Sequence, residues 1–231
     1  MQNIQRLKGF AAWLKYEHFY NKNPRQTYDK ISENADYDGI VDFDGRSGTL
    51  EKLTRGIKLV NKRVLDIACG SGAFISAVVR KNPGEIVGVD ISGGMLKLAR
   101  ERFRRNKKVR FINKSFMDVN FKRESFDLIL LANASRYIPK GKEKAFFNKV
   151  KKWLKKDGVF IIHSDFWNGL LGKLLAPVIF FLSNKSNINP NTTFAWNLEK
   201  ELKKYFVIKR KTTIGWEGLR GGKHMAFICE R

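Results

Sequence analysis

The segment 64–74 contains the residues of this sequence that are best placed to bind a ligand. It reads VLDIACGSGAF, an apolar run followed by Gly70 and Gly72. Glycines between a strand and a helix let the backbone approach a ligand closely. Asp90 ends the next apolar run, 20 residues after Gly70, where a carboxylate can accept hydrogen bonds from both hydroxyls of a ribose. The spacing therefore predicts a nucleoside-binding site.

Two details of this segment distinguish between nucleoside cofactors. The fingerprint of pyrophosphate-binding sites has a third glycine at the position that Ile75 occupies here. Asp66 lies just before the turn. A negative group there is unfavourable beside a pyrophosphate but favourable beside an ammonium and a sulfonium, because opposite charges attract in a partly desolvated site. We therefore expect S-adenosylmethionine rather than NAD.

With the strands around it, this motif resembles that of the class I (Rossmann-like) S-adenosylmethionine-dependent methyltransferases, the small-molecule branch in particular. The resemblance covers about residues 60–164. It implies that four residues of the turn hold the methionine part of the cofactor: Asp66, Ala68, Gly70 and Gly72. Ala68 stands where the family often has glycine. The resemblance also implies that Asp90 binds the ribose and that Ile91 and Met95 flank the adenine, although Met95 fits equally well as a core residue of a helix.

The same resemblance assigns roles to residues after the third and fourth strands. Ser115, Phe116 and Met117 align with the loop that meets the adenine. Ser115 departs from the family, which usually has an acidic residue there. Asn133 is implied to lie near the reacting methyl group. The segment 131–137 reads LANASRY and lacks the Asn/Asp-Pro-Pro-aromatic pattern, so methylation of the amino groups of nucleic-acid bases is not expected.

Methyl transfer from a sulfonium makes few demands on catalytic side chains. The protein must align the acceptor with the methyl group and exclude water. A base is useful only for a phenol or enol acceptor, and His163 and Tyr137 are then the candidates. His163 fits equally well as a buried structural residue at a strand end. Three residues of the N-terminal segment are expected to close over the cofactor: Tyr28, Tyr37 and Arg46.

Short β-branched runs alternate with helical stretches from residue 62 onward, which is typical of a parallel sheet covered by helices. The predicted strands are 62–67, 85–90, 109–113, 126–132, 158–163, 205–213 and 224–230, and the predicted helices 73–81, 93–106, 141–156 and 197–204. The fold class is α/β, with a doubly wound, mostly parallel, seven-stranded Rossmann-like sheet whose last strand is antiparallel. Periodicity predicts the buried face of the helix at 141–156: Ala145, Phe146, Val150, Trp153 and Leu154.

The 231 residues are expected to form a single domain. Residues 1–60 would form an N-terminal helical cap, and 61–231 a core with a lid insertion at 165–196. Within the insertion, 166–182 is apolar but shorter than the roughly 20 residues that cross a bilayer. We expect no transmembrane segment. An apolar lid favours a small or amphipathic acceptor, quinone-like or lipid-like, and predicts peripheral contact with an anionic membrane. A lid packed wholly inside the protein is the alternative.

Cysteine content and the first residues indicate the compartment. Cys69 and Cys229 are too few for a disulfide framework or a zinc site. Cys69 is expected to be a small buried hydrophobe. The first 20 residues mix charges into every apolar stretch, unlike a secretory signal. These features predict a cytoplasmic protein without a metal.

The net charge of +23 leaves a second function open. Residues 61–164 carry 24 basic and 9 acidic groups, and such a field attracts polyanions. The basic runs around 97–110 and 140–156 belong to helices expected on opposite faces of the sheet, so we expect no single nucleic-acid groove. An RNA methyltransferase is therefore the second hypothesis, and a non-catalytic cofactor-binding protein the third.

Overall fold

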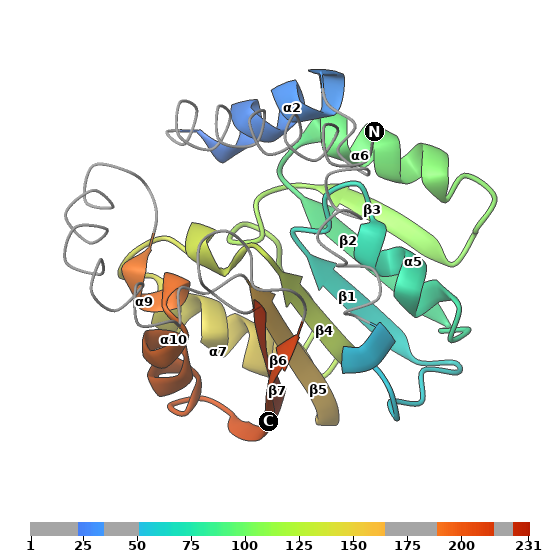
Figure 1. Ribbon diagram of the computed structural model, residues 1–231. Helices are drawn as coiled ribbons and strands as arrows, with labels where there is room; N and C mark the ends of the chain where they lie inside the picture. Colours follow the sequence, from blue (N-terminus) through green and yellow to red (C-terminus); the bar gives the residue numbers. More distant parts are fainter. Residues whose placement is uncertain (1–22, 35–50, 165–188, 215–223) are drawn as a thin grey trace, which may run out of the picture.

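The computed structural model describes residues 23–34, 51–164, 189–214 and 224–231. At its centre is a seven-stranded sheet with the order β3-β2-β1-β4-β5-β7-β6 (Figure 1). The strands are β1 (Arg63–Ile67), β2 (Glu85–Asp90), β3 (Val109–Asn113), β4 (Phe126–Ala132), β5 (Leu154–Ser164), β6 (Val207–Ile214) and β7 (His224–Glu230). Strands β1 to β5 are parallel to one another, and β7 is antiparallel to both β5 and β6. The predicted fold class is confirmed.

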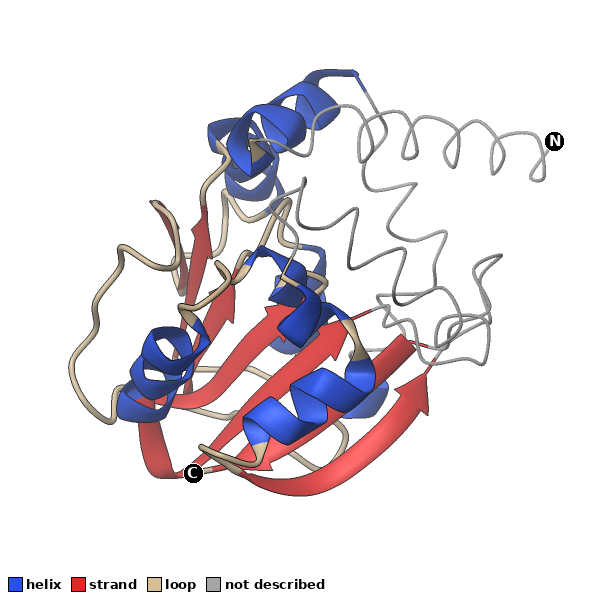
Figure 2. Ribbon diagram, turned by 90° about the vertical axis from the view of Figure 1, so that its left-hand side faces the viewer, coloured by secondary structure: helices blue, strands red, loops and turns tan. Residues whose placement is uncertain are grey.

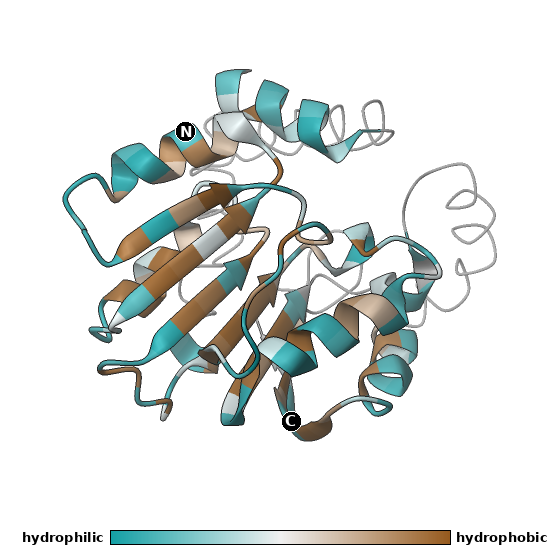
Figure 3. Ribbon diagram, turned by 180° about the vertical axis from the view of Figure 1, so that it is seen from behind, coloured by the Kyte–Doolittle hydropathy of each residue, from teal (hydrophilic) through white to brown (hydrophobic). Residues whose placement is uncertain are grey.

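Helices cover both faces of this sheet, so the structure has three layers (Figure 2). Buried residues of α5 (Ala73–Val79) and α6 (Gly93–Arg102) form one hydrophobic cluster with one face. Buried residues of α7 (Glu143–Trp153) and α10 (Ala195–Leu202) form a second cluster with the other face. The central residues of the strands are mostly hydrophobic (Figure 3), as expected for parallel strands that are buried on both sides.

The helix predicted at 141–156 is shorter than its periodicity indicated. α7 ends at Trp153, because Leu154 already has extended backbone and begins β5. The buried face also differs from the prediction. Ala145 is exposed, whereas Phe147 is fully buried beside Phe146, Val150 and Trp153. Phe146, Val150 and Trp153 thus lie on the buried face as predicted, but Phe147 extends that face on one side and Ala145 lies outside it.

Two segments outside the regular α/β pattern reach the carboxyl ends of the parallel strands. α2 (Pro24–Asn34) packs on α6, as Figure 1 shows. The short helices η1 (Ser135–Tyr137) and α9 (Pro190–Thr193) pack together beyond β4. α2 belongs to the predicted cap, and α9 to the predicted insertion. The apolar part of that insertion, 166–182, lies outside the described residues, which contain no helix long and apolar enough to span a membrane.

Candidate active site

The turn between β1 and α5 has a left-handed backbone at three positions. The φ angles are 57° at Ala68, 53° at Gly70 and 78° at Gly72. The N–H of Gly70 donates to Oδ2 of Asp90 at 2.8 Å. This hydrogen bond joins the turn to the end of β2, so the two parts of the predicted nucleoside motif meet. They meet at the carboxyl ends of β1 and β2, close to the point between β1 and β4 where the strand order reverses, which is where doubly wound sheets bind ligands.

Asp90 is held in place by backbone donors on both of its oxygens. The N–H of Ser92 donates to Oδ1 at 2.8 Å, opposite the bond from Gly70 to Oδ2. Burial raises the pKa of the Asp90 carboxyl, while the N–H donors of Ser92 and Gly70 act against this rise. A carboxylate has about four lone-pair sites. Asp90 therefore keeps acceptor capacity for the hydroxyls of a ribose.

Asp66 is the polar group whose surroundings most clearly require a ligand. Its side chain is fully buried, and within the described residues neither carboxylate oxygen has a hydrogen-bond partner. Burial, and secondarily the charge of Asp90, raises the pKa of Asp66 well above its usual value. A buried carboxyl without a donor is costly. A cationic ligand would offset that cost, so Asp66 fits the ammonium-bearing cofactor that the sequence predicts.

Gly72 serves the packing between helices. A Cβ at this residue would lie 2.7 Å from the side chain of Phe103, at the end of α6. Gly72 is also the N-cap residue of α5, with its positive φ. A side chain here would have to displace the ring of Phe103. Ile75, at the position of the third glycine in dinucleotide sites, is buried in the same cluster.

Asp29, in α2, belongs to this site although the sequence did not indicate it. Its Oδ1 accepts hydrogen bonds from Oγ of Ser92 at 2.6 Å and from the N–H of Gly94 at 3.0 Å. The first turn of α6 contains no acidic residue of its own, so Asp29 supplies the negative charge that a helix N-terminus favours. Through Ser92, α2 is connected to Asp90.

Close packing and a third hydrogen bond support this contact between α2 and α6. Nε of Arg25 donates to the carbonyl of Ile91 at 3.1 Å. A Cβ on Gly94 would overlap Oγ of Ser32. The glycine pair that opens α6 was the one local signal that another segment packs there. It does not identify α2, because the partner lies more than 60 residues away in the sequence.

The predicted catalytic candidate Tyr137 meets the N-terminal helix. Its hydroxyl lies 3.2 Å from that of Tyr28, and the two rings are edge to face with centroids 6.1 Å apart. Tyr28 was expected to close over the site, and it lies on the side of α2 that reaches η1. Tyr37 and Arg46, which carried the same expectation, lie outside the described residues.

The end of the predicted insertion is bonded to the helix that carries Tyr137. Nδ2 of Asn189 donates to the carbonyl of Ile138 and to Oε1 of Glu143, both at 2.9 Å. Oγ1 of Thr192 donates to the carbonyl of Ser135 at 2.7 Å, and Oγ of Ser135 donates to the carbonyl of Thr192. These bonds are buried. The chain therefore returns from the insertion directly beside η1.

His163, the other catalytic candidate, is almost fully buried in β5. Its ring is edge to face with Phe74 of α5, with centroids 6.1 Å apart. Its carbonyl accepts a hydrogen bond from the N–H of Asn133 at 2.7 Å. Asn133 has a φ of 53°, a conformation that asparagine tolerates better than most residues. The structure thus brings Asn133 to the end of β4, next to a histidine that packs in the interior.

The residues expected around the adenine are only partly assembled. Met95 is fully buried in α6 and its N–H donates to Oγ of Ser92. Oγ of Ser115 accepts from the N–H of Met117, and the ring of Phe116 packs edge to face on Phe146 of α7. Burial agrees with the core interpretation of Met95. Contacts of Ser115, Phe116 and Met117 with a cofactor stay a prediction.

Comparison with known proteins agrees with this arrangement. The model of the methyltransferase domain family matches residues 64–158. The phosphoethanolamine N-methyltransferase of Plasmodium falciparum is 32% identical over 120 residues, covering 50% of this chain and 45% of that protein. The demethylmenaquinone methyltransferase of Lactiplantibacillus plantarum is 29% identical over 127 residues, covering 52% and 54%. The chain spans about half the length of these relatives.

Solved structures share the fold over most of the chain. A protein from Pyrococcus horikoshii OT3 superposes with a TM-score of 0.65 at 23% identity, covering 82% of this chain and 91% of that one. The geranyl diphosphate C-methyltransferase of Streptomyces coelicolor A3(2), in complex with S-adenosyl-L-homocysteine, has a TM-score of 0.63 at 13% identity, covering 80% and 77%. These two structures, the matched domain and the arrangement of Gly70, Asp90 and Asp66 at the glycine turn support the same conclusion. Residues 64–158 are a methyltransferase domain, and its fold and glycine-turn motif are those of the class I S-adenosylmethionine-dependent methyltransferases.

Proposed function

We propose that the protein transfers a methyl group from S-adenosylmethionine to a small or amphipathic acceptor, quinone-like or lipid-like. The observation that carries this proposal is the buried Asp66 carboxyl, which has no hydrogen-bond donor among the described residues and lies near Asp90 at the glycine turn. In a protein with a net charge of +23, this is a locally acidic site. It favours a cationic ligand.

The cofactor supplies a methyl group that its sulfonium already activates for displacement, and the residues of the chain bind and orient. Asp66 would balance the ammonium, and Asp90 would accept the ribose hydroxyls. The contacts of Asp29 with the first turn of α6 hold α2 against the loop that follows Asp90. A helix in that position excludes water from the site, which strengthens each electrostatic contact inside it.

The nature of the acceptor is inferred from the insertion and from the relatives. The sequence of 166–182 is rich in Phe, Leu, Ile and Val, and the chain returns from it beside η1. The described residues on either side of this segment lie at the end of β5 and beside η1, and an apolar segment between them suits an apolar substrate. Tyr28 and Tyr137 would then offer hydroxyls to a phenol, enol or carbonyl of the acceptor. In-line transfer needs little more than this alignment.

A binding and transfer experiment tests the proposal. Calorimetry should detect binding of S-adenosylmethionine and S-adenosylhomocysteine to the protein but no binding of NAD. The Asp90→Ala variant should lose charge-assisted hydrogen bonds of about 1.5–3 kcal/mol each, at least about tenfold in affinity. Asp157→Ala, which removes an exposed carboxylate, is the matched control. Tighter binding of NAD would refute the cofactor assignment.

The acceptor is tested with tritiated cofactor against four substrates: a demethylated quinone, a sterol, phosphoethanolamine and bulk RNA. We expect label in the quinone or sterol fraction. Label in phosphoethanolamine alone would refute the apolar acceptor, and label in RNA alone would make the protein an RNA methyltransferase. Binding of the cofactor without transfer to any extractable cell fraction would indicate a non-catalytic binding protein.

A further inference from the structure

Basic residues gather at the amino ends of the strands, opposite the candidate active site. We call this edge the amino-end rim and define it by the residues that lead into each strand or leave β7: 61–63, 80–85, 104–110, 122–127, 152–157, 203–207 and 230–231. The rim holds 17 Lys and Arg against 5 Asp and Glu. It therefore carries about half of the net charge of +23.

The sheet turns these scattered segments into a row. Strand pairing aligns Val109, Ile86, Val64, Leu128, Val159, Glu230 and Val207 across the seven strands. Neighbouring strands lie about 4.8 Å apart, so the row is about 29 Å long. β6 is antiparallel to β7, as β5 is. Its first residues therefore belong to the same edge as the starts of the parallel strands.

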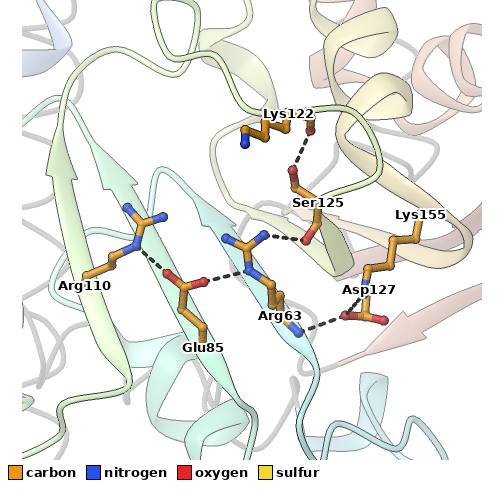
Figure 4. A network of polar contacts seen from close by, with 7 residues as sticks. All are labelled: Arg63, Glu85, Arg110, Lys122, Ser125, Asp127 and Lys155. Carbon is orange, nitrogen blue, oxygen red and sulfur yellow. Dashed lines mark hydrogen bonds and ion pairs between the residues drawn. The ribbon is translucent and has the colours of Figure 1, made fainter.

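Acidic residues of the rim hold the basic side chains in place. Glu85 lies between Arg63, whose Nε is 2.7 Å from Oε2, and Arg110, whose Nε is 2.5 Å from Oε1 (Figure 4). Asp127 lies between Lys62 at 3.2 Å and Lys155 at 2.9 Å. Each acid thus joins two cations from neighbouring strands and leaves one positive charge in excess.

The same pattern recurs at the end of β7. Oε1 of Glu124 lies 2.6 Å from Nη1 of Arg231 and 3.4 Å from Nε of Arg123. Burial alone would raise the pKa of Glu85, but the hydrogen bonds from Arg110 and Arg63 lower it below its usual value. These acids stay ionised at neutral pH. They order the row of cations without neutralising it.

The excess of positive charge is largest where β3 begins. Residues 104–110 contain five basic residues and no acidic one. Other rim cations pair with acids outside the rim, as Arg80 does with Glu51 and Lys203 with Glu199. Arg105 and Lys107, by contrast, form no ion pair with a described residue. The β3 end is therefore the strongest anion-attracting part of the rim.

A cleft opens at this end of the rim. Its volume is about 580 Å³, and it is lined by Val79, Asn82, Pro83, Arg102, Phe103, Arg105, Asn106, Lys107 and Lys108. Nζ of Lys108 donates to Oδ1 of Asn82 at 2.7 Å, which fixes that lysine at the wall. Cations beside an aromatic and apolar floor suit a ligand that combines phosphate with a planar base.

The position of the rim separates nucleic acid from a membrane as its partner. A bilayer docked there would have the active site on the side facing away from it. The large exposed hydrophobic side chains of the rim are Val207 and, next to 61–63, Val60, which lie at different strands. Peripheral membrane binding needs apolar insertion together with charge. A narrow row of cations instead matches a phosphate backbone.

We propose that the amino-end rim binds the phosphate backbone of a single-stranded nucleic acid, which enters at the cleft of 102–108 and follows the row toward β4 and β5. The nucleic acid is a partner here and not the methyl acceptor, because the rim and the glycine turn lie at opposite ends of the strands. This proposal is independent of the acceptor proposed above.

Fluorescence anisotropy with a labelled 20-nucleotide oligo(U) RNA and an oligo(dT) DNA tests the proposal. The triple variant Arg105→Gln, Lys107→Gln, Lys108→Gln should bind the RNA at least about tenfold more weakly. Its slope of log affinity against log salt should fall by about 2, since each lost phosphate contact removes about 0.7. The control variant Lys97→Gln, Lys142→Gln, Lys144→Gln removes the same charge from exposed positions outside the rim, and should change the affinity by less than threefold.

Binding of both oligonucleotides identifies the phosphate backbone as the ligand, and binding of RNA alone adds the 2′-hydroxyl. Cofactor affinity should stay unchanged in both variants, and neither variant should have a lower Tm than the native protein. Equal losses of RNA affinity in both variants would show that the effect comes from net charge alone, and would overturn the proposal. The proposal would also be overturned if the native protein did not bind the oligonucleotides at about 0.1 M salt, or if it methylated the RNA. A third contradicting result would be a triple variant that no longer binds phosphatidylserine vesicles but still binds the RNA.

Discussion

Asp66 lies in the middle of the sheet, between Gly88 of β2 and Leu130 of β4. A carboxyl there has no access to water and no donor among the described residues. Its usual pKa is 3.8, and burial raises the folded-state pKa well above that value. As the pH rises from 3.8, the unfolded chain releases this proton before the folded protein does. Asp66 therefore costs stability with rising pH until the folded-state pKa is passed.

The Asp66→Asn variant separates this cost from the benefit in binding. Without cofactor, Tm of the variant should exceed that of the native protein at pH 7. The difference should shrink toward pH 4, where the Asp66 carboxyl approaches neutrality in both the folded and the unfolded protein. Affinity for S-adenosylmethionine should fall about tenfold or more, because an amide does not balance an ammonium. Scanning calorimetry with and without cofactor measures both. A lower Tm at pH 7 would mean that the carboxylate has a protein partner.

Ala68 has a left-handed backbone that favours glycine. At a φ of 57°, an L-residue with a Cβ is strained by about 1–2 kcal/mol, which exceeds the entropic cost of glycine. We expect Ala68→Gly to stabilise the protein by about 0.5–1 kcal/mol, an increase in Tm of about 1–4 °C. Ala77→Gly, in the helical backbone of α5, is the control and should destabilise. Destabilisation by both substitutions would show that the Ala68 methyl packs more than it strains.

At the scale of elements, the packing of α2 on α6 depends on the carboxylate of Asp29 and on the absence of a side chain at Gly94. Gly94→Ala should displace α2, because the new Cβ overlaps Oγ of Ser32. Asp29→Asn should weaken the same contact by losing the charge in its bonds to Ser92 and Gly94. Hydrogen exchange of the α2 amides should accelerate in both variants, and cofactor affinity should fall several-fold because Ser92 also donates to Asp90.

Two variants act as controls for this prediction. Glu33→Gln removes an exposed charge from α2 and should change neither measurement. Ser32→Ala combined with Gly94→Ala removes the overlapping oxygen and should restore part of the protection, a coupling that independent sites do not have. If the double variant is no better protected than Gly94→Ala, α2 is not packed on α6 through this pair.

The net charge of +23 is a property of the whole molecule. Raising NaCl from about 0.1 M to about 1 M shortens the screening length from about 10 Å to about 3 Å. Repulsion between like charges then weakens more than the exposed ion pairs do, since each of those contributes only about 0–1 kcal/mol. We expect Tm to rise by about 2 °C or more, equivalent to about 1 kcal/mol.

The triple variant Arg105→Gln, Lys107→Gln, Lys108→Gln tests the origin of this effect. It has three fewer positive charges in the part of the rim without acids, so its Tm should rise less with salt. A Tm that falls with NaCl would mean that ion pairs such as that of Glu85 with Arg63 outweigh the repulsion.

The sequence by itself determined the alternation of strands and helices. It also determined the part of the site whose residues lie within one strand-helix-strand unit. Short apolar β-branched runs that are bounded by turn residues favour buried strands. Gly70 and Asp90 are separated by a single strand-helix-strand unit, whose right-handed crossover leaves few alternatives. The end of α7 was not predictable in this way. Leu154 continues the apolar pattern of the helix, and only pairing with Phe126 makes it part of β5.

The tertiary structure alone decided which distant segments join this local motif. Asp29 reaches Ser92 and Gly94, and Asn189 reaches Ile138, across at least about fifty residues of sequence. The basic residues of the rim come from seven separate segments, which became one row when the strands were placed side by side. Periodicity and motif spacing report on neighbours within a few turns or one crossover. Contacts between distant segments depend on packing free energy, which is summed over the whole chain.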